Sequence, residues 1–108
     1  MKEIRAFIQP HKLSYVTVAL MEIPNFPGMS VIDCNGFGRE HTDHTQDYKT
    51  FLPRKRLEIF APDSLVEIIF QTIMRTAHSG RHGDGKVYII DTLEGGRIST
   101  GERAPDLG

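Results

Sequence analysis

The sequence is poor in several residue types that would indicate particular classes of protein. Its 108 residues include one cysteine and no tryptophan. Cys34 has no partner for an intrachain disulfide or for a zinc site built from several thiolates, as is common in reducing compartments. Lysine and arginine total 13 against 14 aspartate and glutamate residues, so the net charge is −1. This balance leaves no basic excess for binding a nucleic-acid backbone, and we expect no nucleic-acid partner.

Long hydrophobic runs are also lacking. No stretch approaches the roughly 18 consecutive apolar residues of a membrane span. The charged residues Lys2, Glu3 and Arg5 stand where a secretory leader would begin its apolar run. We therefore expect a soluble, cytoplasmic protein. Residues 1–108 have room for a single domain, whose core is small enough that association of subunits is expected to stabilise it.

Apolar residues recur with strand spacing in four segments and with helix spacing in two. The predicted strands cover residues 2–9, 29–35, 54–61 and 87–90, and the predicted helices cover 12–22 and 64–77. Ser64 and Glu67 match a capping box at the start of the second helix. The apolar stripe of that helix comprises Leu65, Ile68, Ile69, Thr72, Ile73, Thr76 and Ala77. The polar segment 36–50 is expected to be a long exposed loop, and the tail has room for one short strand around Arg97 and Ile98.

The element order β-α-β-β-α-β predicts an α+β fold, a ferredoxin-like sandwich. Its sheet is antiparallel, and both helices cover the same face. The second face of the sheet then has no covering layer within the chain. Such a face is usually hidden by association, so the predicted fold also indicates an oligomer.

A glycine-rich turn, GRHGDGK at residues 80–86, is the sharpest motif of the chain. Backbone amides and a lysine in such a turn can hold a phosphate. The spacing also fits GxxxxGK, but Val87 follows where a Walker loop needs serine or threonine, and the next segment is a strand. We exclude the Walker loop, and an ordinary turn into the strand stays open as the alternative.

Other polar clusters are less specific. Gly36–Glu40 (GFGRE) and Arg97–Glu102 (RISTGE) add glycines, cations and hydroxyls. His41 and His44, with neighbouring carboxylates, are weak metal candidates, because two histidines in a loop are more often solvated. Cys34 falls within a predicted strand, where a thiol usually behaves as a small hydrophobic group, so we expect no catalytic nucleophile.

Taken together, GFGRE, GDGK and RISTGE stand in the order and context of the PII signal-transduction proteins, and the chain resembles that family nearly throughout. The first twenty residues resemble its first strand and helix. PGMSV at 27–31 and FLPRKRLEI at 51–59 resemble its next two strands, and residues 62–89 resemble its second helix, B-loop and fourth strand. The resemblance implies a homotrimer that binds adenine nucleotide (ATP, ADP or AMP) in clefts between subunits. It also implies a T-loop, about 37–53, that contacts a transporter, an enzyme or another regulator, a B-loop at about 78–86 and a C-terminal segment at about 95–108.

Carried over residue by residue, the resemblance assigns phosphate contacts to the GDGK amides and to Arg39, Lys86 and Arg97. It places Met29 and Phe60 near adenine. The full implied nucleotide and effector set is Ile8, Gly28, Met29, Ser30, Gly36, Phe37, Gly38, Arg39, Glu40, Arg54, Glu58, Phe60, Gly83, Asp84, Gly85, Lys86, Arg97 and Ser99.

Three positions depart from the family pattern. Glu40 replaces a glutamine that helps bind magnesium and 2-oxoglutarate, and its carboxylate would repel that ligand. Ser99 replaces an arginine, which removes a phosphate contact, and Arg54 replaces a lysine. The T-loop is shorter and lacks the segment around the modified tyrosine. We expect ADP or AMP to bind at least as readily as ATP. We also expect a second effector other than 2-oxoglutarate, such as bicarbonate, and no uridylylation.

The leading hypothesis is therefore a regulator that is not an enzyme. Two alternatives remain open at this stage. One is a small phosphate-processing enzyme that uses Lys86, Arg39 and a histidine such as His82. The other is a metal sensor that uses His41 and His44.

Overall fold

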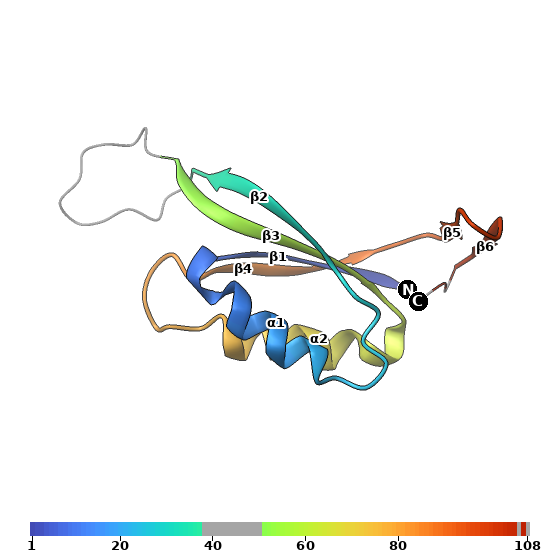
Figure 1. Cartoon of the computed structure of the whole chain (residues 1–108), viewed down its shortest axis with the longest axis horizontal. Coiled ribbons are helices and arrows are strands. Elements are labelled where there is room, and N and C mark those ends of the chain that lie inside the picture. The colour runs from blue at the N-terminus through green and yellow to red at the C-terminus, as the bar shows by residue number, and fades with distance from the viewer. Residues whose placement is uncertain (38–50, 106, 108) are drawn as a thin grey trace.

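The computed structural model of the chain describes residues 1–37, 51–105 and 107. Two helices cover one face of a four-stranded antiparallel sheet whose strand order is β2-β3-β1-β4 (Figure 1). The strands are β1 (Lys2–Ile8), β2 (Ser30–Gly36), β3 (Leu52–Ala61) and β4 (Gly85–Asp91), and the helices are α1 (Leu13–Met21) and α2 (Asp63–Thr76). The predicted ferredoxin-like α+β fold is confirmed, with element boundaries within about two residues of the predicted ones.

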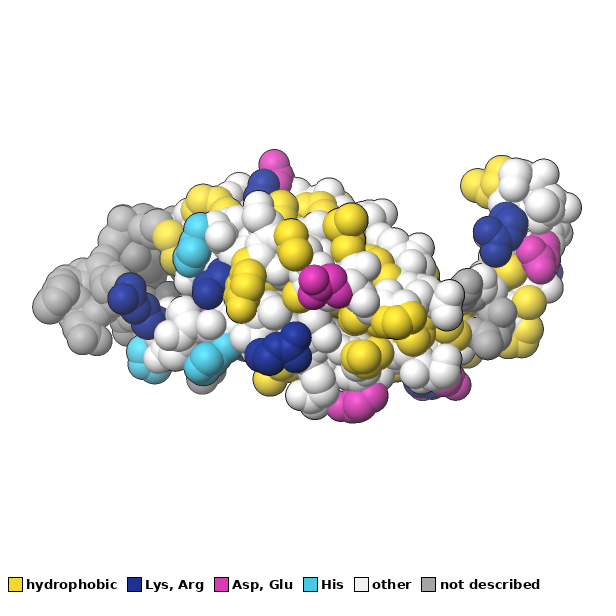
Figure 2. Space-filling model, turned by 60° about the horizontal axis from the view of Figure 1, so that its bottom comes forward, with side chains coloured by type: hydrophobic (Ala, Val, Ile, Leu, Met, Phe, Trp, Pro, Cys, Tyr) yellow, Lys and Arg dark blue, Asp and Glu magenta, His cyan; other side chains and the backbone are white. Residues whose placement is uncertain are grey.

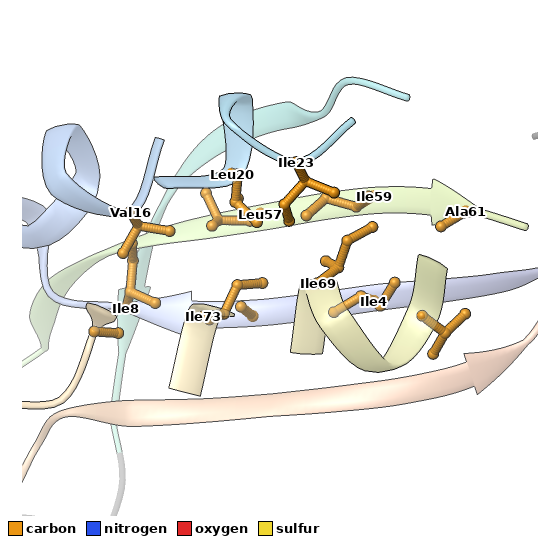
Figure 3. Close-up of a cluster of buried hydrophobic side chains, with 13 residues drawn as sticks. Ile4, Ile8, Val16, Leu20, Ile23, Leu57, Ile59, Ala61, Ile69 and Ile73 are labelled. Atoms are coloured by element: carbon orange, nitrogen blue, oxygen red, sulfur yellow. The ribbon is translucent and has the colours of Figure 1, made fainter. Parts of the chain in front are cut away.

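The core lies between the helices and the sheet. Alternate side chains of the strands point toward the helices and form one layer of it. Ile4, Ala6 and Ile8 of the central strand β1 are buried on the helical side, as are Leu57 and Ile59 of β3. The helices contribute the facing layer with Val16, Leu20, Ile69 and Ile73 (Figure 3). Because β1 lies between β3 and β4, its backbone is hydrogen-bonded on both sides, and its carboxyl end is firmly positioned.

A single-turn 3-10 helix, η1 (Pro10–Lys12), joins β1 to α1. Pro10 is its first residue. The amide at this position has no acceptor within the helix, so the hydrogen that proline lacks breaks no hydrogen bond. Helix α1 ends at Met21, shortly before Pro24, and Gly28 with φ of 101° turns the chain toward β2. These breakers account for the predicted end of the first helix.

Helix α2 begins differently from the prediction. Its N-cap is Pro62, Asp63 is its first residue, and no side chain caps its amides. The predicted capping box is therefore wrong. Glu67 instead accepts a hydrogen bond from Gln71 Nε2 at 2.8 Å, one turn further along the helix. Since Pro62 holds an extended conformation, the helix starts immediately after it, and Ser64 lies inside the first turn.

The buried face of α2 is narrower than the predicted stripe. Ile69 is fully buried, whereas the side chain of Ile68 is 47% exposed. Thr72 and Thr76 lie in the buried face, and each hydroxyl donates a 2.7 Å hydrogen bond to the carbonyl four residues earlier. These bonds satisfy the hydroxyls and let threonine occupy a core position.

The second face of the sheet has no covering layer among the described residues (Figure 1). It exposes the large apolar side chains Ile32, Phe60 and Tyr88. Between them lie the ion pairs Glu3–Arg5 and Arg56–Glu58, and Glu3 is only 5% exposed. A mixed surface of this kind, with aromatic and paired charged side chains, is typical of protein interfaces.

The tail differs from the prediction of one short strand. It forms a two-stranded hairpin of β5 (Gly95–Arg97) and β6 (Glu102–Ala104), which projects from the sheet as an arm (Figure 1). Gly101, with φ of 76°, closes the turn. The radius of gyration is 15.7 Å, compared with about 13 Å for a compact domain of this length.

Candidate functional site

The described residues of the predicted site gather mainly at one end of the sheet, where β1 ends and where β3 and β4 begin. In the sheet register, Ile8 lies opposite Gly85 on one side and Lys55 on the other. Gly36, at the end of β2, lies opposite Leu52 at the start of β3. Separate segments of sequence therefore meet at this end because antiparallel pairing brings strand ends and strand starts together.

The carbonyl oxygen of Gly83 connects the glycine turn to the residue that follows β1 and to β3. Gln9 Nε2 donates to it at 2.9 Å, and Arg54 Nη2 donates to it at 3.4 Å. Arg54 Nη1 also donates to the carbonyl of Pro53 at 2.8 Å. The Arg54 guanidinium thus binds the backbone carbonyls of Pro53 and Gly83 at the same time. It can do so because its planar group carries several N–H donors. The sequence does not indicate the part played by Gln9, which stands 74 positions from Gly83.

Asp84 organises the turn from within. Its carboxylate accepts hydrogen bonds from the amides of Ser79 and Gly80, at 2.7 and 3.0 Å, and from the Ser79 hydroxyl. His78 Nδ1 lies 3.8 Å away. Burial disfavours the charged carboxylate, but the hydrogen bonds and His78 together outweigh it and lower the pKa of Asp84. Asp84 therefore stays ionised and holds the loop in shape.

Gly85 is required at its position by geometry. Its φ is 106°, and a Cβ atom there would lie 1.8 Å from the carbonyl oxygen of Phe7. Gly83 also has a left-handed conformation, with φ of 88°. Two such glycines turn the backbone sharply, and Lys86 follows them with an exposed side chain. This arrangement of a tight glycine turn and a lysine is suited to an anion such as phosphate.

A cavity of about 170 Å³ lies beside the turn, between α2 and β4. Ile8, Ile73 and Val87 form apolar walls, and His78 and Lys86 supply polar groups at the rim. Sites for drug-sized ligands usually occupy about 300–1,000 Å³. The cavity is therefore too small for a complete nucleotide.

The remaining described site residues lie elsewhere in the same chain. Ser30 is opposite Glu58 in the middle of the sheet, and Phe60 is near its far end, opposite Glu3. Arg97 lies on the arm, where its Nε is 3.1 Å from Glu102 Oε1 and its Nη2 donates to the carbonyl of Leu107 at 3.4 Å. Ser99 is exposed in the turn between β5 and β6. Within one chain, these residues do not form a single site.

Five predicted residues lie outside the described part of the chain. They are Gly38, Arg39, Glu40, His41 and His44. Among the residues that the structure does describe, no group of three or more histidine, cysteine, aspartate or glutamate side chains could hold a metal ion.

Comparison with known proteins identifies the family. The model of the family "Nitrogen regulatory protein P-II" matches residues 1–102. "Nitrogen regulatory protein P-II 1" of Escherichia coli (strain K12) is 43% identical over 108 residues, which cover 94% of this chain and 95% of the relative. "Nitrogen regulatory protein P-II" of Azospirillum brasilense is 41% identical over 112 residues and covers 98% of both chains. The chain belongs to the nitrogen regulatory protein P-II family.

Membership in the P-II family confirms the resemblance carried by the glycine motifs. It establishes that the chain belongs to a family of signal-transduction regulators. The family match extends to residue 102 and so includes the turn at Gly83–Lys86 and most of the arm. No helix in the described ranges combines the length and apolar character required to traverse a bilayer.

Proposed function

We propose that this P-II family protein binds an adenine nucleotide, ADP, AMP or ATP, with its phosphates at the turn Gly83–Lys86, and that it acts as a regulator without catalysing a reaction. The glycine turn is the observation that carries this proposal. Its backbone is fixed by Gln9, Arg54 and Asp84 before any ligand arrives. A preorganised turn with an adjacent ammonium group favours a phosphate because little conformational freedom is lost on binding.

The complete site is proposed to lie between the subunits of a homotrimer. The cavity of one chain is too small for a nucleotide, and the other predicted contacts stand on the open face and on the arm. The open face also carries an unsatisfied donor, since Arg56 Nε is buried without a hydrogen-bond partner among the described residues. A second subunit on this face would cover its aromatic side chains and would bring separate segments together at one cleft.

The proposed output is control of a transporter or an enzyme through the T-loop at about 37–53, in the cytoplasm. Nucleotide binding would order or release this loop, which is a common form of switch. A second small effector, such as bicarbonate, is proposed in place of 2-oxoglutarate. The proposal follows from Glu40, whose carboxylate would repel a dicarboxylate ligand.

Isothermal titration calorimetry with ATP, ADP and AMP tests the nucleotide site. We expect at least one of them to bind, and we expect Lys86→Ala to weaken binding by about tenfold or more, because a charge-assisted hydrogen bond to phosphate is lost. Lys2→Ala is the matched control, since Lys2 lies at the other end of the sheet and pairs with Asp91. It should leave the affinity unchanged.

Two results would contradict the proposal. The first is the absence of binding by all three nucleotides. The second is sustained nucleotide turnover that survives purification and disappears in Lys86→Ala, which would make the protein an enzyme. Titration of bicarbonate and of 2-oxoglutarate against the nucleotide-bound protein then tests the second effector, because a synergistic ligand raises the affinity for its partner ligand.

A further inference from the structure

A groove of about 660 Å³ lies between the start of the first helical segment and the loop that leads from α2 to β4. It adjoins the proposed nucleotide site through Gln9 and Ser79, which help to hold the glycine turn, but none of the residues predicted to contact the nucleotide lines it. Its basic side chains are His11, Lys12, Arg81 and His82, and its hydroxyl groups come from Tyr15 and Ser79. Every one of these side chains can donate a hydrogen bond.

None of the described residues lining the groove is acidic. The carboxylate of the same loop, Asp84, accepts its hydrogen bonds from Ser79 and Gly80 within the loop, as described above. This concentration of donors and cations, with no carboxylate among the described lining residues, favours an anionic ligand.

The lysine and the arginine of the groove, Lys12 and Arg81, have no carboxylate partner among the described residues. Lys12 Nζ is 3.5 Å from the carbonyl oxygen of His78 and 5.7 Å from the centre of the Tyr15 ring. The Arg81 guanidinium has no ion-pair or hydrogen-bond partner within the described ranges. Both are therefore available to a carboxylate from another molecule.

Figure 2 shows the helical side of the molecule, with histidine and lysine or arginine side chains gathered at its left-hand end. In Figure 1, η1 and the loop between α2 and β4 lie at this same end. The basic groups thus cluster at the end of the molecule that carries the groove. A partner could approach this region from solvent, because His11, Arg81 and His82 are all exposed.

We propose that this groove docks an acidic peptide segment of a partner protein. A single exposed ion pair contributes little affinity, so one small anion would be held weakly. A peptide with several carboxylates can meet Lys12 and Arg81 together, and its approach is accelerated by their field. The inference rests on the proposed function only in requiring that this regulator has a protein partner.

Fluorescence anisotropy with a labelled octaglutamate peptide tests the groove in the full chain. We expect binding that weakens as salt rises from about 0.05 M to about 0.3 M, because salt screens exposed charges. The double variant Lys12→Ala, Arg81→Ala should lower the affinity by about threefold to tenfold. Arg75→Ala is the matched control, since Arg75 is an exposed arginine of α2 that does not line the groove, and it should bind as the wild type does.

Several outcomes would overturn the inference. These are a wild-type protein that does not bind the peptide, a double variant that binds as well as the wild type, and an equal loss in Arg75→Ala. Binding of inorganic tripolyphosphate with the same dependence on Lys12 and Arg81, but no binding of the peptide, would also overturn it and would indicate a small-anion site. Calorimetry with ADP on the same preparations separates this inference from the nucleotide proposal, because the double variant should bind ADP as the wild type does.

Discussion

At the scale of single residues, the glycine turn depends on atoms that lie far apart in the sequence. Gly83 accepts hydrogen bonds from Gln9 and Arg54, and Gly85 lies against the carbonyl of Phe7. Asp84 holds the loop from inside. The turn is thus attached to β1, β3 and its own loop, and this attachment explains how a loop rich in glycine keeps one conformation.

We predict that Gly85→Ala destabilises the protein by roughly 2–4 kcal/mol or displaces the start of β4. The new methyl group would lie 1.8 Å from the Phe7 carbonyl oxygen, and the left-handed φ would be strained as well. Urea denaturation measures the change. Gly96→Ala is the control, because its Cβ would meet Glu102 only at 3.6 Å. Equal stability of both variants would refute the close approach at Gly85.

A second residue-scale prediction concerns pH. The folded state lowers the pKa of Asp84, so the unfolded chain takes up a proton at this carboxyl first as pH falls. The stability supplied by Asp84 should be present above the ordinary aspartate pKa and should be lost as pH drops through the lowered folded value. Asp84→Asn should lower stability by about 1 kcal/mol at neutral pH and should reduce the loss of stability in acid.

Denaturant unfolding of both proteins at neutral and acid pH measures this difference. Glu22→Gln serves as the control, because Glu22 is an exposed carboxylate after α1 that makes no ion pair or side-chain hydrogen bond among the described residues and is not part of the turn. A wild type and an Asp84→Asn variant that lose stability in parallel as the pH falls would show that Asp84 does not act in this way.

At the scale of the element, α2 buries only some of the residues that the sequence pattern assigns to its apolar stripe. Ile68 and Ile69 both belong to the predicted stripe, yet only Ile69 packs between the helices and the sheet. Neighbouring residues on a helix point about 100° apart, so two consecutive isoleucines cannot both face one narrow core. The sequence pattern also misplaces the start of the helix. Pro62, and not Ser64, is the residue that precedes its first turn.

We predict that Ile69→Ala lowers the free energy of unfolding by about 2–5 kcal/mol, because it leaves a cavity in the core. Ile68→Ala removes the same atoms from a half-exposed position and should cost no more than about 1 kcal/mol. Thermal or denaturant unfolding compares the two. Similar losses in both variants would mean that Ile68 is buried in solution, against the arrangement described above.

At the scale of the whole molecule, the chain has features of one part of a larger assembly. One sheet face is covered by helices, the other exposes Ile32, Phe60 and Tyr88, and the arm extends away from the body. The longest dimension is 53 Å and the others are 25 and 20 Å. An elongated chain with an aromatic open face gains most from association with copies of itself.

The proposed homotrimer leads to a prediction about mass in solution. Tyr88→Glu places a charge in the middle of the open face, beside Phe7, whose ring lies 6.5 Å from that of Tyr88. Burying an unpaired charge is costly, so this variant should dissociate to smaller species. Light scattering after size-exclusion chromatography measures the mass. Val18→Glu alters an exposed position on α1 and should leave the trimer intact.

A wild-type monomer in this experiment would contradict the trimer. It would also leave the proposed phosphate turn with the cavity lined by Gly85 and Lys86, whose volume of about 170 Å³ is too small for a complete nucleotide. The mass measurement therefore tests the premise that the complete site lies between subunits.

The sequence by itself determined the order of the four sheet strands and two helices, the helix-facing residues of the strands and the family, because these depend on local spacing and on short motifs. Only the tertiary structure decided that Gln9 meets Gly83 and that Ile69, not Ile68, packs in the core. It also showed that the tail forms a hairpin of two strands and that Lys12 lines a groove with Arg81. These contacts join segments distant in sequence or depend on the exact rotation of a helix, and local patterns carry no information about either.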